Sequence, residues 1–174
     1  SSTEATASNY DADRVAILKG YNDYIRSVDE DAVVILEHFC ADKEEKELAE
    51  AGMKVWRNIN YAYGQAAQGT QKDSGLGALW TGSTGMRFGG YVGYMESHAE
   101  ERNAFRQKTY GEAEVKGDLA AMMQRLELNA AFFLTVPGPK MIWQFGEIGY
   151  DISIEENGRT GEKPVKTDEY MAVP

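Results

Sequence analysis

Apolar residues recur along the chain at two spacings, which together predict alternating helices and strands. From Asp11 to Ser27 they return every three to four residues, the spacing of one helix face, and they do so again from Leu119 to Phe133. A short charged segment, residues 42–52, is predicted to form a further helix. Short apolar runs predict strands at residues 32–39, 53–60, 91–97 and 140–147.

This order of elements predicts an α/β fold. Strands that alternate with helices are typical of right-handed crossovers and a parallel sheet. The run at residues 32–39 is continuously apolar, which favours a strand buried on both faces. We expect residues 1–10 to be a flexible lead-in, and residues 11–174 to form one domain. Residues 69–90 are rich in Gly, Ser and Thr and predict a long functional or mobile loop.

Composition narrows the classes of function. Of the 174 residues, 43% are hydrophobic and 26% are charged, as in soluble globular proteins. The net charge of -10 argues against nucleic acid and against anionic membrane surfaces as partners, and favours a neutral ligand such as a sugar or peptide. No run approaches the ~20 apolar residues of a membrane span. The first residue is not Met, so targeting information could have been removed, and localisation stays open.

Candidate chemistry gathers where the predicted strands end, because the loops at the carboxyl ends of parallel strands converge. Glu37 follows four apolar residues, so we expect a desolvated carboxyl group with a raised pKa, suited to general acid catalysis. An equally weighted alternative is an acid that caps the next helix or pairs with an arginine. His98 ends the third strand, either as a donor to a substrate hydroxyl or as a satisfied neutral side chain.

Cysteine and metal chemistry are not favoured. Cys40 lies only two residues from His38, too close for the usual catalytic pairing, and we expect a semi-buried thiol. His38 and His98 are far apart and lack metal-ligand spacing, so no metal site is expected. Aromatic residues make up 11% of the chain, and their flat faces suit carbohydrate rings, although core packing explains several of them.

Three stretches resemble one known family: VILEHF, GYMESHAEER and FFLTVPGPKMIWQFGEIGYD. They are similar to the second half of the catalytic barrel of the α-amylase family, glycoside hydrolase family 13, in its Bacteroidetes branch. The resemblance covers the chain from about Tyr10 onward. It implies a partial (half) TIM-type (β/α)8 barrel, strands five to eight with their helices, and retaining hydrolysis of α-1,4-glucans such as starch. No cofactor is expected, because the family's calcium sites lie mostly outside this segment.

The resemblance also assigns roles to single residues. Glu37 matches the general acid, and His98 matches the sugar-binding histidine. Ala99 stands where the family has its third catalytic carboxylate. His38 and Glu147 are expected to lie at the same substrate-binding strand ends. The family's G-x-R-x-D nucleophile segment has no counterpart in this sequence, so the chain is expected to be weak or inactive alone.

The expected ligand is an α-glucan oligosaccharide. We also expect a homodimer, or pairing with a complementary fragment, through the open sheet edges of a half-barrel. Two alternatives remain. The chain could be a small active amylase in which Glu96, Glu101 or Asp151 replaces the nucleophile, or a non-catalytic carbohydrate-binding or structural module. The resemblance is compatible with a secreted or periplasmic parent protein.

Overall fold

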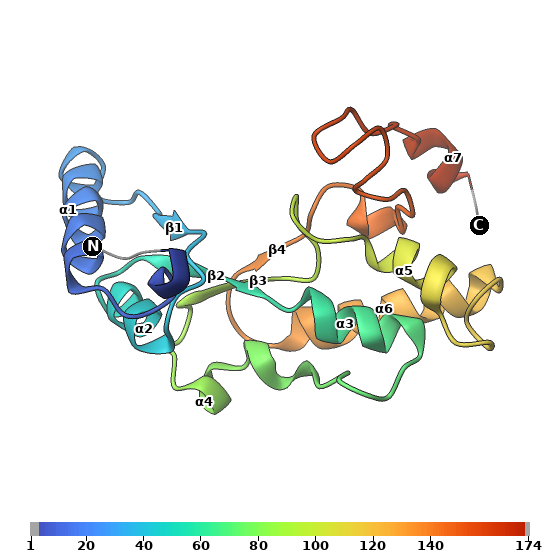
Figure 1. Cartoon of the computed structure of the whole chain (residues 1–174), viewed down its shortest axis with the longest axis horizontal. Coiled ribbons are helices and arrows are strands. Elements are labelled where there is room, and N and C mark those ends of the chain that lie inside the picture. Colours follow the sequence, from blue (N-terminus) through green and yellow to red (C-terminus); the bar gives the residue numbers. More distant parts are fainter. Residues whose placement is uncertain (1–3, 173–174) are drawn as a thin grey trace. The chain divides into compact units, whose positions relative to one another are not determined.

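The computed structural model describes residues 4–172, which form helices and a four-stranded parallel sheet (Figure 1). The strands follow one another in the order β1-β2-β3-β4. They are β1 (Ile35–Leu36), β2 (Lys54–Asn58), β3 (Tyr91–Tyr94) and β4 (Lys140–Met141). The prediction of an α/β fold with a parallel sheet is confirmed.

The helices of the described residues vary widely in length. They are α1 (Ala12–Val28), α2 (Asp42–Glu50), α3 (Asn60–Gln68), α4 (Thr81–Thr84), α5 (Asn103–Tyr110), α6 (Leu119–Thr135) and α7 (Thr167–Met171). Short 3-10 turns are η1 (Glu4–Thr6), η2 (Leu76–Leu79) and η3 (Gly146–Ile148). No helix among residues 4–172 is both long and apolar enough to cross a bilayer.

The chain divides into two compact units. The first unit comprises the chain up to Arg57 together with Leu79–Gly93 and Pro137–Pro139. The second unit comprises Asn58–Ala78, Tyr94–Val136 and the chain from Lys140 onward.

In the first unit, α1 packs on α2 over a small apolar core. Asp11 caps α1, since its carboxylate accepts hydrogen bonds from the backbone N–H of Asp13 at 3.0 Å and of Arg14 at 3.2 Å. The core consists of Val15, Leu48 and Met53, with Leu18, Val34, Leu36 and Ala51 packed against it. Arg14 also donates to the carbonyl groups of Ala7 and Asn9, so part of the expected lead-in is tied to α1.

The expectation that residues 32–39 form a strand buried on both faces is wrong. Only Ile35–Leu36 form strand β1, and burial alternates along the run. Val34 and Leu36 pack against the core of the first unit, whereas Val33 and Ile35 are 63% and 46% exposed. Successive side chains of an extended chain point to opposite faces, so helices cover one face of β1 and leave the other open.

In the second unit, α3, α5 and α6 pack together (Figure 1). Gln107 on α5 joins its two neighbours, because its amide donates to the carbonyl of Ala67 and to that of Met122, both at 2.9 Å. Asn129 on α6 donates to the carbonyl of Tyr63 on α3 at 2.8 Å. These buried amides satisfy backbone groups between helices and fix the framework that carries the end of β3.

Candidate functional site

The end of β3 carries a buried charge network. Glu96 is only 8% exposed, and its carboxylate accepts from Arg102 Nη1 at 3.1 Å and from the backbone N–H of Asn103 at 2.8 Å. Arg102 also donates to the carbonyl of Gln144 at 2.9 Å and lies over the ring of Tyr150. Burial raises the pKa of Glu96, and the hydrogen bonds from Asn103 and Arg102 offset this only in part. The network anchors the turn after β3 to the start of α5.

The turn that follows is held by short-range hydrogen bonds. The Ser97 hydroxyl donates to the carboxylate of Glu100 and accepts from the backbone N–H of Ala99 at 3.1 Å. Asn58 donates to the other oxygen of Glu100 at 2.5 Å, and Arg159 donates to the Ala99 carbonyl at 2.7 Å. The backbone at Ala99 is therefore fixed, although its side chain offers no functional group.

Two rings lie beside this turn. His98 is exposed, and its ring centroid lies 6.1 Å from that of the half-buried Trp143, with 56° between the ring planes. Trp143 follows β4 and so comes from a different part of the second unit. A tilted pair of an imidazole and an indole offers both a polar edge and an apolar face, which is the mixture that a sugar ring requires.

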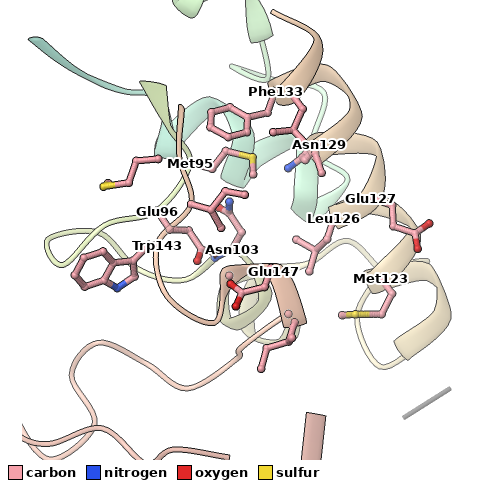
Figure 2. A pocket seen from close by; sticks show the side chains of 17 residues that line it. Met95, Glu96, Asn103, Met123, Leu126, Glu127, Asn129, Phe133, Trp143 and Glu147 are labelled. Atoms are coloured by element: carbon pink, nitrogen blue, oxygen red, sulfur yellow. The ribbon is translucent and has the colours of Figure 1, made fainter. Parts of the chain in front are cut away.

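A cavity of about 450 Å³, which Trp143 helps to line, lies within the second unit (Figure 2). Glu96 and Asn103 lie among the residues that line it, and Trp143 and Glu147 line it as well. Its other walls are mainly aliphatic side chains from α6 and from the end of β4. Such walls offer few hydrogen bonds, so a polar sugar fits the ring pair better than it fits the cavity.

Glu37 and His38, which follow β1, belong to the first unit. Glu37 is exposed, so the desolvation expected from the four preceding apolar residues is absent. By strand alternation it shares the open face with Val33 and Ile35. The His38 side chain is 9% exposed, and its Nε2 lies 2.6 Å from Oε1 of Glu44, so His38 takes part in a helix contact.

Glu44 is the centre of that contact. It is fully buried and accepts from Arg14 Nε at 2.7 Å, Arg14 Nη2 at 2.9 Å and the backbone N–H of Asp11 at 2.8 Å. Burial pushes its pKa upward, but these hydrogen bonds and that from His38 outweigh burial and lower the pKa to about 2. Ligand atoms of His38, Cys40 and Glu44 lie within 4.8 Å of one another. Arg14 already supplies the positive charge that a cation would bring, so the cluster is best described as an ion-pair network.

The acids considered as substitute nucleophiles are all engaged in structural contacts. Glu96 is held as described above. The Glu101 carboxylate accepts from the Ser153 hydroxyl at 2.7 Å and from the backbone N–H of Ile154 at 3.0 Å. Asp151 pairs with Lys108 at 2.8 Å and accepts a hydrogen bond from Tyr170. A nucleophile needs an accessible oxygen aimed at the substrate, and these contacts occupy oxygens of all three groups.

The second unit therefore brings together His98, Ala99 and Trp143 around one turn, with Glu147 on the wall of the adjoining cavity. Sequence reasoning did not single out Arg102, Asn103 or the pairing of Trp143 with His98. Arg102 lies six positions after Glu96, an acid at a strand end, and this pattern could have predicted their ion pair. The ring pairing joins residues 45 positions apart, and no local spacing predicts it.

A scan of protein-family models found none that matches the chain, and a search of curated proteins found no match either.

Proposed function

We propose that this chain is a segment of an α-amylase-like glycoside hydrolase, strands five to eight of a (β/α)8 barrel, that binds α-glucan but does not cleave it alone. The sheet order carries the proposal. Four parallel strands lie side by side in chain order. The family-like stretches VILEHF and PGPKMIWQFGE contain β1 and β4, and GYMESHAEER contains the last two residues of β3, each with the residues that follow the strand. Consecutive parallel order is the arrangement of neighbouring barrel strands.

The open face of β1 supports the same proposal. A barrel strand is covered by helices on its outer face and faces other strands on its inner face. Val34 and Leu36 pack on the helical core, while Val33 and Ile35 are exposed. Glu37 follows on the open face, where the family's general acid would point into the barrel.

Binding without turnover is favoured because one surface suits a sugar, whereas the candidate nucleophiles among residues 4–172 are held in structural contacts. His98 and Trp143 supply the surface. Ala99 replaces a carboxylate, and the substitute acids Glu96, Glu101 and Asp151 hold structural contacts. A retaining mechanism requires two carboxyl groups about 5 Å apart across one glycosidic bond. We propose that cleavage needs a further polypeptide segment that supplies the nucleophile.

The test is hydrolysis of maltoheptaose, followed by chromatography of the products. We expect binding but no products from the parent chain, from Glu37→Gln and from Ala99→Asp, because none of them supplies a nucleophile. Products from the parent chain that disappear in Glu37→Gln would favour the small active amylase instead. Absence of both binding and products would contradict the proposal.

Association through the sheet edges is part of the same proposal. The strands at the two ends of the sheet are β1 and β4, and within residues 4–172 the only strand neighbour of β1 is β2. Unpaired strand edges favour pairing with another chain. We expect sedimentation velocity to detect a dimer at micromolar concentration, and a clean monomer there would count against association.

A further inference from the structure

The cavity of the second unit has the form of a groove along one helix. One wall is a face of α6, where Met123, Glu127, Ala130 and Leu134 follow one another at helical spacing. The other wall comes from β4 and the residues after it, among them Ile142. Trp143 also belongs to this wall (Figure 2).

The dimensions of the groove suit several apolar side chains in a row. Met123 and Leu134 are 11 positions apart, which at 1.5 Å per residue is about 16 Å along the helix axis. Its volume is about 450 Å³. A three-turn helix that presents apolar residues at positions i, i+3 or i+4, and i+7 would cover this length and fill such a space.

The charged residues that line the groove are all acidic. Glu127 and Glu147 are exposed carboxylates that line it, and the buried Glu96 lines it as well. The lining contains neither Lys nor Arg. Within the described part of the chain, Glu127 and Glu147 form no ion pair. A partner with basic residues beside its apolar face would complement this rim.

We propose that this groove is the docking site of an amphipathic helix with an apolar face flanked by Lys or Arg. The length along α6 favours a helix over a compact small molecule, and the carboxylates select a basic helix. Trp143 lines the groove and also pairs with His98, so the two sites adjoin at this ring, but the inference does not depend on glucan binding.

The test uses a fluorescein-labelled 14-residue peptide of Leu and Lys, with Leu at i, i+3, i+4 and i+7 positions, and fluorescence anisotropy. Controls are a scrambled peptide of the same composition and a Leu/Glu peptide with the same Leu positions. Two exposed leucines of α6 give a matched pair of protein variants. Leu134 lines the groove and is 56% exposed, whereas Leu128 lies outside it and is 53% exposed.

We expect saturable binding of the Leu/Lys peptide, weakened about tenfold or more by Leu134→Arg and less than about twofold by Leu128→Arg. Charge reversal of the exposed pair, Glu127→Lys with Glu147→Lys, should weaken the Leu/Lys peptide and strengthen the Leu/Glu peptide. Circular dichroism checks that each variant is folded, and the charge-reversed pair tests the proposal even if Leu134→Arg unfolds. Equal binding of the scrambled peptide, or equal effects of the two leucine changes, would overturn the proposal.

Discussion

Each unit of this protein buries a glutamate beside an arginine, and the two carboxyl groups behave in opposite ways. Glu44 in the first unit has a pKa lowered to about 2, although it is fully buried. Glu96 in the second unit has a raised pKa. Both pair with an arginine, so the presence of a cation alone does not decide the direction of the shift.

The difference lies in the balance between donors, burial and neighbouring charge. Glu44 accepts two hydrogen bonds from Arg14, one from a backbone N–H and one from His38. Glu96 accepts one from Arg102 and one from a backbone N–H. Burial destabilises both charged forms. At Glu44 four donors outweigh it, whereas at Glu96 burial exceeds the effect of two donors and the nearby Glu101 carboxylate raises the pKa further. The first unit thus holds a stable carboxylate, whereas the second holds an acid whose neutral form is favoured by its surroundings.

The largest expected effect is that of Glu44→Ala. Removing this carboxylate leaves Arg14 without its main partner and the space of a buried side chain empty. We expect the free energy of unfolding in urea to fall by about 3 to 5 kcal/mol. Glu50→Ala, at an exposed position of the same helix, is the control and should stay within about 0.5 kcal/mol. Similar losses of unfolding free energy for the two variants would show that the buried network stabilises the fold no more than a surface acid does.

Acid titration should sharpen the comparison. A lowered pKa means that the folded state binds the proton less tightly than the unfolded state. Glu44 therefore contributes stability above its ordinary pKa of 4.5, and this is lost as the pH falls toward about 2. The full loss is about 3 kcal/mol, because the pKa falls from 4.5 to about 2 and each tenfold change in proton affinity corresponds to about 1.4 kcal/mol. Urea midpoints of Glu44→Gln should change less between pH 5 and pH 2 than those of the parent chain, and parallel slopes would refute this.

Glu96→Gln should show the opposite pH dependence. A raised pKa in the folded state means that ionisation destabilises the fold as the pH rises above 4.5. The glutamine cannot ionise, so its stability relative to the parent chain should improve from pH 4 to pH 7. The difference at pH 7 should stay within about 2 kcal/mol, because one charged hydrogen bond to Arg102 is weakened. A relative stability that declines over this pH range would mean that the Arg102 pair outweighs burial.

The smallest effect should come from Lys166→Ala. Its ion pair with Glu169 is exposed on both sides, at 40% and 70%. Solvent screens such pairs, and we expect at most about 0.5 kcal/mol in urea unfolding. A loss comparable to that of Glu44→Ala would show that exposure does not separate strong ion pairs from weak ones in this chain.

Regular patterns of the sequence predicted the larger elements of the fold, and tertiary contacts decided the rest. The helical spacing from Asp11 to Ser27 corresponds to α1, because local periodicity specifies a long helix. The burial of residues 32–39 was not predictable, because apolar composition does not reveal that only one face of β1 is covered. Helix α3 was missed, since NYAYGQAAQ lacks strong apolar periodicity and is stabilised by contacts with α5 and α6.

The candidate site, like the fold, could be predicted from the sequence only in part. The sequence predicted that polar residues follow the third strand, and the structure places them after β3. Their proposed role in binding stays a prediction. The sequence did not predict which of these residues is structural. Glu96 and His98 are only two positions apart, and burial alone distinguishes the structural acid from the exposed ring. The expected desolvation of Glu37 failed for the same reason, since exposure depends on what covers the strand.

Glucan binding by the rings of the second unit is the central claim, and isothermal titration calorimetry with maltoheptaose tests it most directly. Trp143 pairs with His98, whereas Trp80 is 55% exposed in the first unit and serves as the matched tryptophan. We predict that the parent chain and Trp80→Ala bind maltoheptaose alike, and that Trp143→Ala weakens binding about tenfold, the scale of one stacked aromatic ring. Equal affinity of the two tryptophan variants, or no binding by the parent chain, would contradict the account.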